Sequence, residues 1–164
     1  MKLWGGGVVS TAVEERDGVV YEHRQFGTFI VAIAVAIDAV LAAILASSPV
    51  VRTETVVLGP AFVLVGIAAG LFSSLTIRVT RTQLQWWLGI KPLGMRVALA
   101  EIASAAPIKT NVFEGWGIHL TWHGWLWNVA GFNAVQIELR GGTRYALGTP
   151  EPEKLTQAII SARV

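Results

Sequence analysis

Residues 29–46 read FIVAIAVAIDAVLAAILA, with Asp38 as their single charge, and residues 56–75 read VVLGPAFVLVGIAAGLFSSL, with no charge at all. As helices these segments are about 27 Å and 30 Å long, close to the thickness of the hydrocarbon layer of a bilayer. The polar link of residues 47–55 is short, so the two helices must run antiparallel. The sequence therefore predicts a transmembrane helical hairpin over residues 29–75.

Basic residues flank this hairpin unevenly. Three precede residue 29 and four follow soon after residue 75, whereas the link contains only Arg52. Because positive charge favours the cytoplasmic side, we expect a multi-pass protein of the plasma (inner) membrane with both termini in the cytoplasm. A cleaved secretory signal is the alternative, but nearly thirty residues of mixed charge come first and no A-x-A pattern lies near Ala46.

The composition excludes several classes of protein. Of the 164 residues, 53% are hydrophobic and only 15% are charged, whereas an average soluble domain carries about 25% charged residues. The chain has no cysteine, which excludes disulfide scaffolds, cysteine-ligated zinc and thiol nucleophiles. The net charge of +2 is too small to indicate a nucleic-acid partner.

After the apolar segments the pattern changes to the alternation of half-buried strands. It appears in residues 75–80, 84–88 and 97–99, and again in residues 135–140 and 145–147 around a Gly141-Gly142 turn. A helix follows from about Pro150, with an apolar stripe at the spacing i, i+3, i+4, i+7. Residues 13–16 and 19–22 suggest a short hairpin around Asp17-Gly18.

The order of these parts resembles the bacterial pleckstrin-homology-like membrane proteins. The resemblance is strongest from residue 116 to residue 159, in Trp116-Gly117-Ile118, the strand 135–140, the Gly-Gly turn with Arg144, and Gly148-Thr149 followed by Pro152-Glu153-x-Leu155. It implies an α+β membrane protein in which the transmembrane hairpin is followed by a PH-like antiparallel β-barrel or sandwich, closed by a C-terminal α-helix. The expected divisions are a cytoplasmic segment 1–28, the hairpin 29–75 (helices 29–46 and 56–75), and a cytoplasmic domain 76–164.

Polar and small residues within the apolar segments are candidates for helix packing or function. Asp38 lies at the centre of the first segment, where a carboxylate indicates a functional site by default. It is interpreted as a buried structural acid, a contact to a partner chain or part of a proton path. Its expected depth matches Gly66, and Gly66-x-x-x-Gly70 permits close helix approach, either within the hairpin or between chains.

Six of the seven tryptophans follow residue 75, which is more than a small core accommodates. Adjacent Trp86 and Trp87 must point to opposite faces of a strand. We therefore take an aromatic surface as the candidate interaction site, formed by Trp87, Trp122, Trp125, Trp127 and His123. The alternative is that another segment of the chain covers these rings.

The chain offers no recognisable catalytic, cofactor or metal site. His119 and His123 in an extended segment lie about 13 Å apart, too far to chelate one ion. The sequence contains no P-loop, and no Ser/His/Asp set can be proposed without Asp38, which is expected to lie within the membrane. Residues 76–164 carry nine Lys or Arg and five Glu, but the charges do not cluster, so specific phosphoinositide binding is not expected.

The sequence thus predicts a membrane-anchored, non-catalytic binding or scaffold module. The expected partners are the lipid bilayer and either another membrane protein, to which the chain would be an accessory subunit, or a second copy of the chain. The alternative function is a small transport or proton-linked membrane component that uses Asp38.

Overall fold

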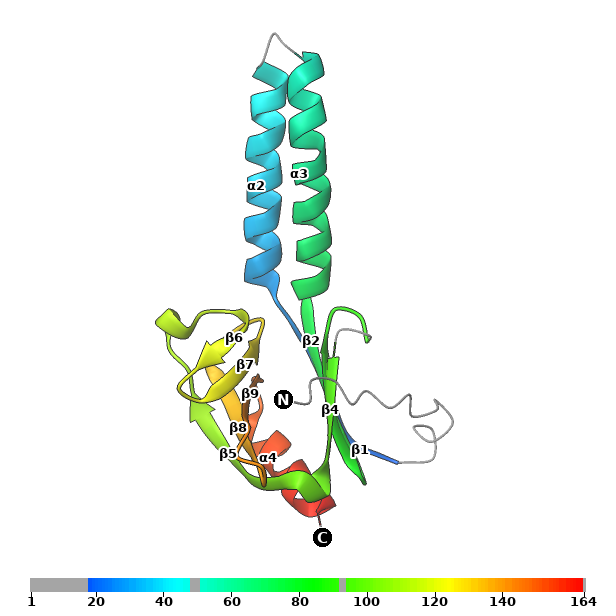
Figure 1. Ribbon diagram of the computed structural model, residues 1–164, viewed down its shortest axis with the longest axis vertical. Helices are drawn as coiled ribbons and strands as arrows, with labels where there is room; N and C mark the ends of the chain where they lie inside the picture. Colours follow the sequence, from blue (N-terminus) through cyan, green and yellow to red (C-terminus); the bar gives the residue numbers. More distant parts are fainter. Residues whose placement is uncertain (1–17, 48–50, 92–93, 164) are drawn as a thin grey trace.

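The computed structural model describes residues 18–47, 51–91 and 94–163, which form two β-sheets, a C-terminal helix and a long helical hairpin that projects from the sheets (Figure 1). Sheet A has the strand order β1-β2-β3-β4, built from Val19–Phe26, Ser74–Thr80, Gln83–Leu88 and Gly94–Ala98. Sheet B has the order β5-β8-β9-β7-β6, built from Ile102–Lys109, Asn133–Leu139, Arg144–Gly148, Gly124–Asn128 and Gly117–Thr121. Two short 3-10 turns, η1 (Leu99–Glu101) and η2 (Val112–Glu114), flank β5.

Alternating apolar side chains build the core between the two sheets. In sheet A, Leu75, Ile77 and Val79 of β2 lie opposite Leu88, Trp86 and Leu84 of β3, and all six are buried. In sheet B the predicted turn is observed at Gly142, whose φ of 83° favours glycine, and it joins β8 to β9. Helix α4 (Pro152–Ala162) buries Leu155 and Ile159 in the same core.

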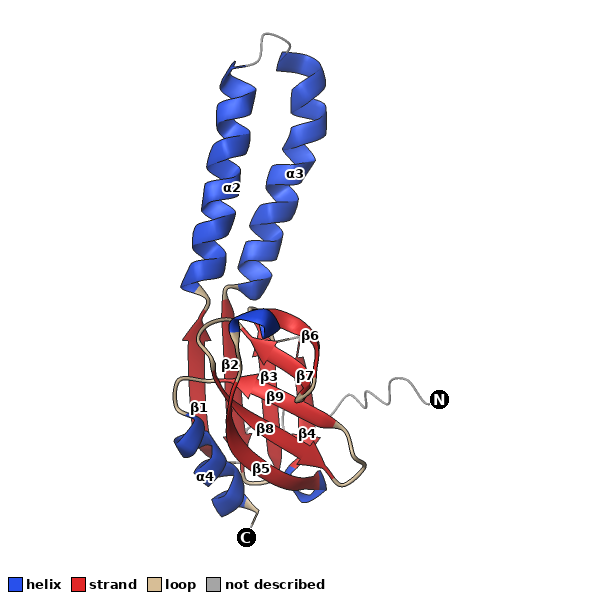
Figure 2. Cartoon of the chain, turned by 90° about the vertical axis from the view of Figure 1, so that its left-hand side faces the viewer, coloured by secondary structure: helices blue, strands red, loops and turns tan. Residues whose placement is uncertain are grey.

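The helical hairpin is an insertion between two neighbouring strands. Helix α2 (Thr28–Ser47) follows β1 and α3 (Val51–Phe72) precedes β2, and these strands pair from Val19↔Thr80 to Phe26↔Ser74 (Figure 2). The junction is tight at Gly27, whose N–H donates to the Ser73 carbonyl at 2.8 Å. A Cβ at Gly27 would lie 3.0 Å from the Phe72 carbonyl oxygen, so glycine allows the helices to leave the sheet side by side.

The sheets differ from the predicted closed barrel. Strands β4 and β6 each end a sheet without a further strand partner in the described part of the chain, so both sheets are open. The parallel pairing of β7 with β9 also departs from a purely antiparallel arrangement. Alternation of apolar residues specifies which face of each strand is buried, but it does not specify whether the end strands meet, so the predicted barrel is wrong.

The N-terminal segment also pairs differently from the prediction. Residues 19–22 belong to β1, which pairs with β2 across the inserted hairpin. The other half of the predicted short hairpin, residues 13–16, lies outside the described residues. The β-domain therefore includes residues on both sides of the hairpin, whereas the sequence assigned it to residues 76–164 alone.

The predicted transmembrane hairpin is not supported. Within residues 18–47, 51–91 and 94–163, no helix combines the length and the apolar character needed to cross a membrane. Helix α2 is continuous and carries one charged residue, Asp38, whereas α3 ends at Phe72, so Ser74 and Leu75 at the end of the predicted span already belong to β2. The predictions of a transmembrane class and of a multi-pass protein in the inner membrane, with both termini cytoplasmic, are therefore wrong.

Candidate functional site

The two helices of the hairpin contact each other along one narrow seam. On α2 the seam is the half-buried or buried stripe Ile30, Ala34, Asp38 and Leu41, and on α3 it includes Val65, Ala69 and Phe72. These residues recur every three or four positions, which is the spacing that brings side chains to one face of a helix. Most residues on the other faces of both helices are exposed.

Those outer faces are unusually apolar. On the described part of the hairpin, ten bulky apolar residues are each between 37% and 66% exposed. Since each leaves about half of its surface exposed, together they expose roughly 1,000 Å² of apolar surface, distributed over several faces of the two helices. These residues are Phe29, Val31, Ile33, Val35, Ile37, Val40, Ile44, Val63, Leu64 and Ile67.

The two glycines predicted to pack against α2 lie outside the seam between the helices. Gly66 and Gly70 are exposed, and a Cβ added to either would have no atom within 4 Å. Exposed Val63 and Ile67 flank them, and we call this group of four the glycine face. On α3 the seam with α2 is made instead by Val65 and Ala69, which lie about 100° around the helix from the adjacent Gly66 and Gly70.

Asp38 lies in the seam and is half-buried. Its Oδ1 atom is buried and has no hydrogen-bond partner among the described residues. Asp38 therefore faces α3 rather than open solvent, as the small-residue stripe around it predicted.

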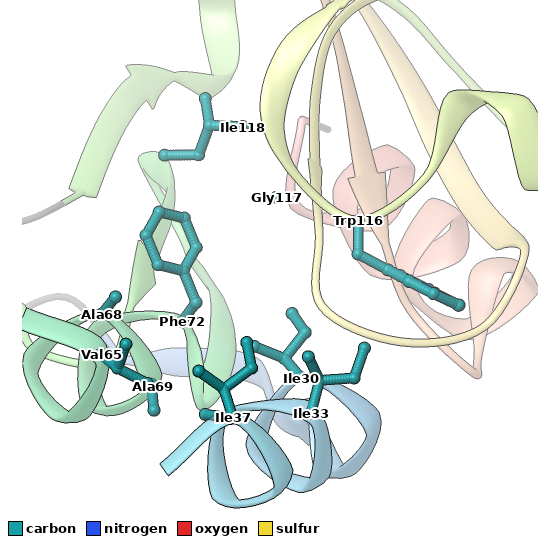
Figure 3. A pocket seen from close by; sticks show the side chains of 11 residues that line it. Ile30, Ile33, Ile37, Val65, Ala68, Ala69, Phe72, Trp116, Gly117 and Ile118 are labelled. Atoms are coloured by element: carbon teal, nitrogen blue, oxygen red, sulfur yellow. The ribbon is translucent and has the colours of Figure 1, made fainter. Parts of the chain in front are cut away.

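An apolar pocket of about 560 Å³ lies on the other side of the hairpin, at its base (Figure 3). Side chains of α2, α3 and the start of β6 form its walls. The lining residues are Ile30, Ile33, Ala34, Ile37, Val65, Ala68, Ala69, Phe72, Trp116, Gly117 and Ile118. Ala68 is two positions from both Gly66 and Gly70, so about 200° of helix rotation separates this pocket from the glycine face.

At one wall of the pocket the ring of Trp116 packs against two phenylalanine rings, one from α2 and one from the β-domain. The ring of Trp116 lies 4.9 Å from that of Phe29 on α2 and 6.2 Å from that of Phe132, both as tilted pairs. Such offset and tilted pairs contribute about 0.5–1.5 kcal/mol beyond their buried area. The Nε1 atom of Trp116 is buried without a hydrogen-bond partner among the described residues. Trp116 thus links the hairpin to the β-domain and leaves one donor unused.

The tryptophans predicted to form one interaction surface are divided among three environments. Trp127 is only 8% exposed and packs edge-on against the buried Trp86 at 6.1 Å. The ring of Trp87 lies beneath the Arg78 guanidinium, at 5.3 Å, and near the Lys91 ammonium, at 5.8 Å. Trp87 is thus engaged by cations, and Trp127 belongs to the core.

Two of the predicted tryptophans remain accessible at the β6–β7 edge. Trp122 is 81% exposed and Trp125 is 46% exposed, and Leu120, opposite Trp125 in the register, is 68% exposed. The expectation that this edge contacts another protein stays a prediction.

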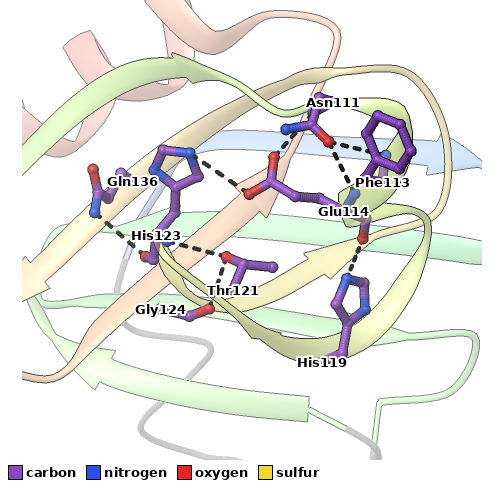
Figure 4. A network of polar contacts seen from close by, with 8 residues as sticks. All are labelled: Asn111, Phe113, Glu114, His119, Thr121, His123, Gly124 and Gln136. Atoms are coloured by element: carbon purple, nitrogen blue, oxygen red, sulfur yellow. Dashed lines mark hydrogen bonds and ion pairs between the residues drawn. The ribbon is translucent and has the colours of Figure 1, made fainter.

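His119 and His123 converge on one buried carboxylate residue (Figure 4). His123 Nε2 lies 3.7 Å from Oε1 of Glu114, whose side chain is 4% exposed, and the His119 ring contacts the Glu114 carbonyl. Glu114 and Asn111 form a capping box: the Asn111 N–H donates to Glu114 Oε2 at 2.9 Å, and Asn111 Oδ1 accepts from the Glu114 N–H. This network fastens η2 to the β6–β7 turn.

The capping signature Asn111-x-x-Glu114 was the sequence signal that could have located this network. The described residues contain no group of three or more potential His, Cys, Asp or Glu ligands for a metal ion.

Comparisons of the chain with family models, with curated proteins and with solved structures give no match. Together with the open sheets and the lack of a membrane-capable helix in the described residues, this overturns the resemblance to bacterial pleckstrin-homology-like membrane proteins. The motifs that suggested it, a Gly-Gly hairpin and a closing helix, occur in many sheet folds because they satisfy general requirements of turns and caps.

Proposed function

We propose that this chain is a non-catalytic assembly module that joins a second copy of itself through the α2–α3 hairpin. The observation that carries the proposal is the exposed glycine face, where Val63 and Ile67 are 60% and 54% exposed and a Cβ added to Gly66 or Gly70 would have no atom within 4 Å. The sheets and α4 would act as the folded base from which the hairpin projects.

The glycine face supports a specific mode of association. Interaxial distances between packed helices are set by the side chains at the contact. Gly66 and Gly70 have no side chain to separate the helices, and Val63 and Ile67 on either side are 60% and 54% exposed. Two hairpins that meet on this face would form a four-helix bundle.

The proposal assigns no reaction or cofactor to the chain. His119 and His123 each contact Glu114 and hold η2 against the β6–β7 turn, which gives them a structural role. The sequence-based alternatives, an accessory subunit of another membrane protein and a proton-linked component using Asp38, both require a membrane-spanning hairpin and are not carried forward.

The test compares two lysine substitutions at positions of similar exposure, one on the glycine face and one outside it. Ile67→Lys places a charge on the glycine face, and Val40→Lys places one on α2, where Val40 is 59% exposed. Sedimentation equilibrium should show a dimer for the wild type and for Val40→Lys, and a monomer for Ile67→Lys. A monomeric wild type would overturn the proposal. Loss of the dimer in Val40→Lys alone would move the interface away from the glycine face and contradict the proposed mode.

A further inference from the structure

The connection between β5 and β6 crosses one side of sheet B. These two strands follow each other in the chain but lie at opposite ends of the strand order β5-β8-β9-β7-β6. The crossing covers four strand spacings, about 19 Å, and a connection of this length can extend about 25 Å. Residues 110–116, which we call the strap, therefore have to pass from one edge of the sheet to the other.

The strap covers the face of sheet B that points away from the core. His119, Leu126 and Ala146 form one row in the register of β6, β7 and β9. Because the neighbouring Trp127 belongs to the core, this row points to the opposite face. Leu126 and Ala146 are nevertheless fully buried, and the His119 ring contacts the Glu114 carbonyl. Glu114 thus lies between the strap and the sheet.

The Glu114 carboxylate is buried and only partly satisfied (Figure 4). Its Oε2 accepts from the Asn111 N–H at 2.9 Å, but its Oε1 is buried with no hydrogen-bond partner among the described residues. His123 Nε2 lies 3.7 Å from Oε1, and the His123 side chain is 30% exposed, so its ring can exchange protons with solvent. A buried carboxylate without a counter-charge is costly. Closure of the strap therefore depends on the charge of His123.

The other ionisable groups near the strap do not supply this counter-charge. The strands that it crosses carry Lys109, His119, Glu138, Arg144 and Tyr145. His119 contacts the backbone carbonyl of Glu114 instead of its carboxylate, and Tyr145 packs in the core. Glu138 and Arg144 are exposed, lie opposite each other and carry opposite charges. Among the described residues, His123 is the cation-forming group within 4 Å of the Glu114 carboxylate.

We propose that the strap is a pH-sensitive clamp between sheet B and the helical hairpin, closed while His123 carries a proton and loosened when that proton is lost. Protonated His123 faces the Glu114 carboxylate only in the closed strap, whereas water solvates both groups when the strap is open. Closure is therefore favoured at the acidic end of the range in which imidazole titrates and is lost toward its alkaline end. Trp116, two residues after Glu114, packs against Phe29 of α2 at 4.9 Å, so an open strap loosens the hairpin.

Amide hydrogen exchange followed by NMR on the full chain tests the clamp, with each rate divided by the rate of an unstructured peptide at the same pH. Protection of the Asn111 amide, which donates to Glu114, should fall about tenfold from about pH 5.5 to about pH 8. Protection of the Ile137 amide in β8, a strand paired on both sides, should not change, which distinguishes local opening from unfolding. In His123→Gln the Asn111 amide should be weakly protected at both pH values.

The matched control is His119→Gln, the same change at the histidine that contacts the Glu114 backbone, and it should keep the tenfold response. Glu114→Gln retains an acceptor for the Asn111 N–H without a charge, so the strap should stay protected at both pH values. Circular dichroism establishes that each variant is folded. Equal protection of the wild-type Asn111 amide at the two pH values would overturn the clamp. A response that persists in His123→Gln, or that disappears in His119→Gln, would overturn it as well.

The clamp and the proposed self-association can fail separately. The strap lies on sheet B and contains no residue of the glycine face. Ile67→Lys should therefore show the wild-type pH response of the Asn111 amide while being monomeric. Loss of that response in Ile67→Lys would contradict a clamp built within one chain.

Discussion

Replacing Gly66 by leucine should move the stability of the monomer and the strength of association in opposite directions. Glycine within a helix is about 0.8–1.0 kcal/mol less favourable than alanine, and leucine is close to alanine on that scale. Gly66 is exposed and a Cβ there meets no atom within 4 Å, so the new side chain causes no clash within the chain. We therefore expect the unfolding free energy of the monomer to rise by about 0.8 kcal/mol.

The same side chain would stand in the proposed interface. A leucine on the glycine face prevents the close approach of two helices, whose axis separation depends on the residues at the contact. We expect the dimer dissociation constant to rise at least tenfold, equivalent to about 1.4 kcal/mol of association free energy. Gly66→Ala is the matched control, because it brings the same gain in helix propensity with a single methyl group and should weaken association much less.

Urea unfolding followed by circular dichroism at 222 nm, at concentrations where the chain is monomeric, measures the first effect, and sedimentation equilibrium measures the second. A less stable Gly66→Leu monomer would contradict the open environment of this residue. A dimer that is unaffected by leucine would refute the glycine face as the interface.

Two further predictions concern the β-domain. Trp86→Ala should lower the free energy of unfolding by about 3–5 kcal/mol in urea unfolding, because Trp86 is fully buried. Trp122→Ala, at an 81% exposed position, should change it by less than about 0.5 kcal/mol. Equal effects of the two substitutions would contradict the assignment of Trp86 to the core. The Lys154 ammonium donates to Glu151 at 2.6 Å and holds the pKa of that carboxyl below its usual 4.5. A pKa lowered by folding stabilises the folded state above 4.5, and this contribution is lost as the pH falls through the folded-state pKa. Lys154→Met should therefore lower the melting temperature slightly at pH 7 and not at pH 2, and a difference that persists at pH 2 would argue against this ion pair as the cause.

Local patterns in the sequence were sufficient to locate most elements of the β-domain. The alternation of Leu75, Ile77 and Val79 corresponds to β2, and the turn at Gly141-Gly142 joins β8 to β9. The C-terminal helix is present but begins at Pro152, two residues after the predicted start. Thr149 lies two residues before the observed N-cap, Glu151, and its hydroxyl accepts a hydrogen bond from the Glu151 N–H at 3.2 Å. These features depend on residues close in sequence, which is why periodicity and turn chemistry reveal them.

The candidate sites depended on contacts that no local pattern contains. Gly66 and Gly70 were expected to face α2, but the seam formed through Val65 and Ala69 instead, because the helix rotation is set by packing of the whole hairpin. Trp127 was expected at the surface, and its packing against Trp86 became visible only when β3 and β7 were placed in facing sheets. The pocket likewise required Trp116, more than forty residues from α3 in sequence, to lie at the base of the hairpin.

The sequence by itself determined the helical hairpin, the strand alternation and the apolar character of both, because these properties follow from residue type and short spacing. The tertiary structure alone decided that β1 pairs with β2 across the hairpin, that the sheets stay open and that the glycines face outward. The physical reason is that burial depends on which surfaces meet, and a pattern of apolar residues specifies a face without specifying its partner.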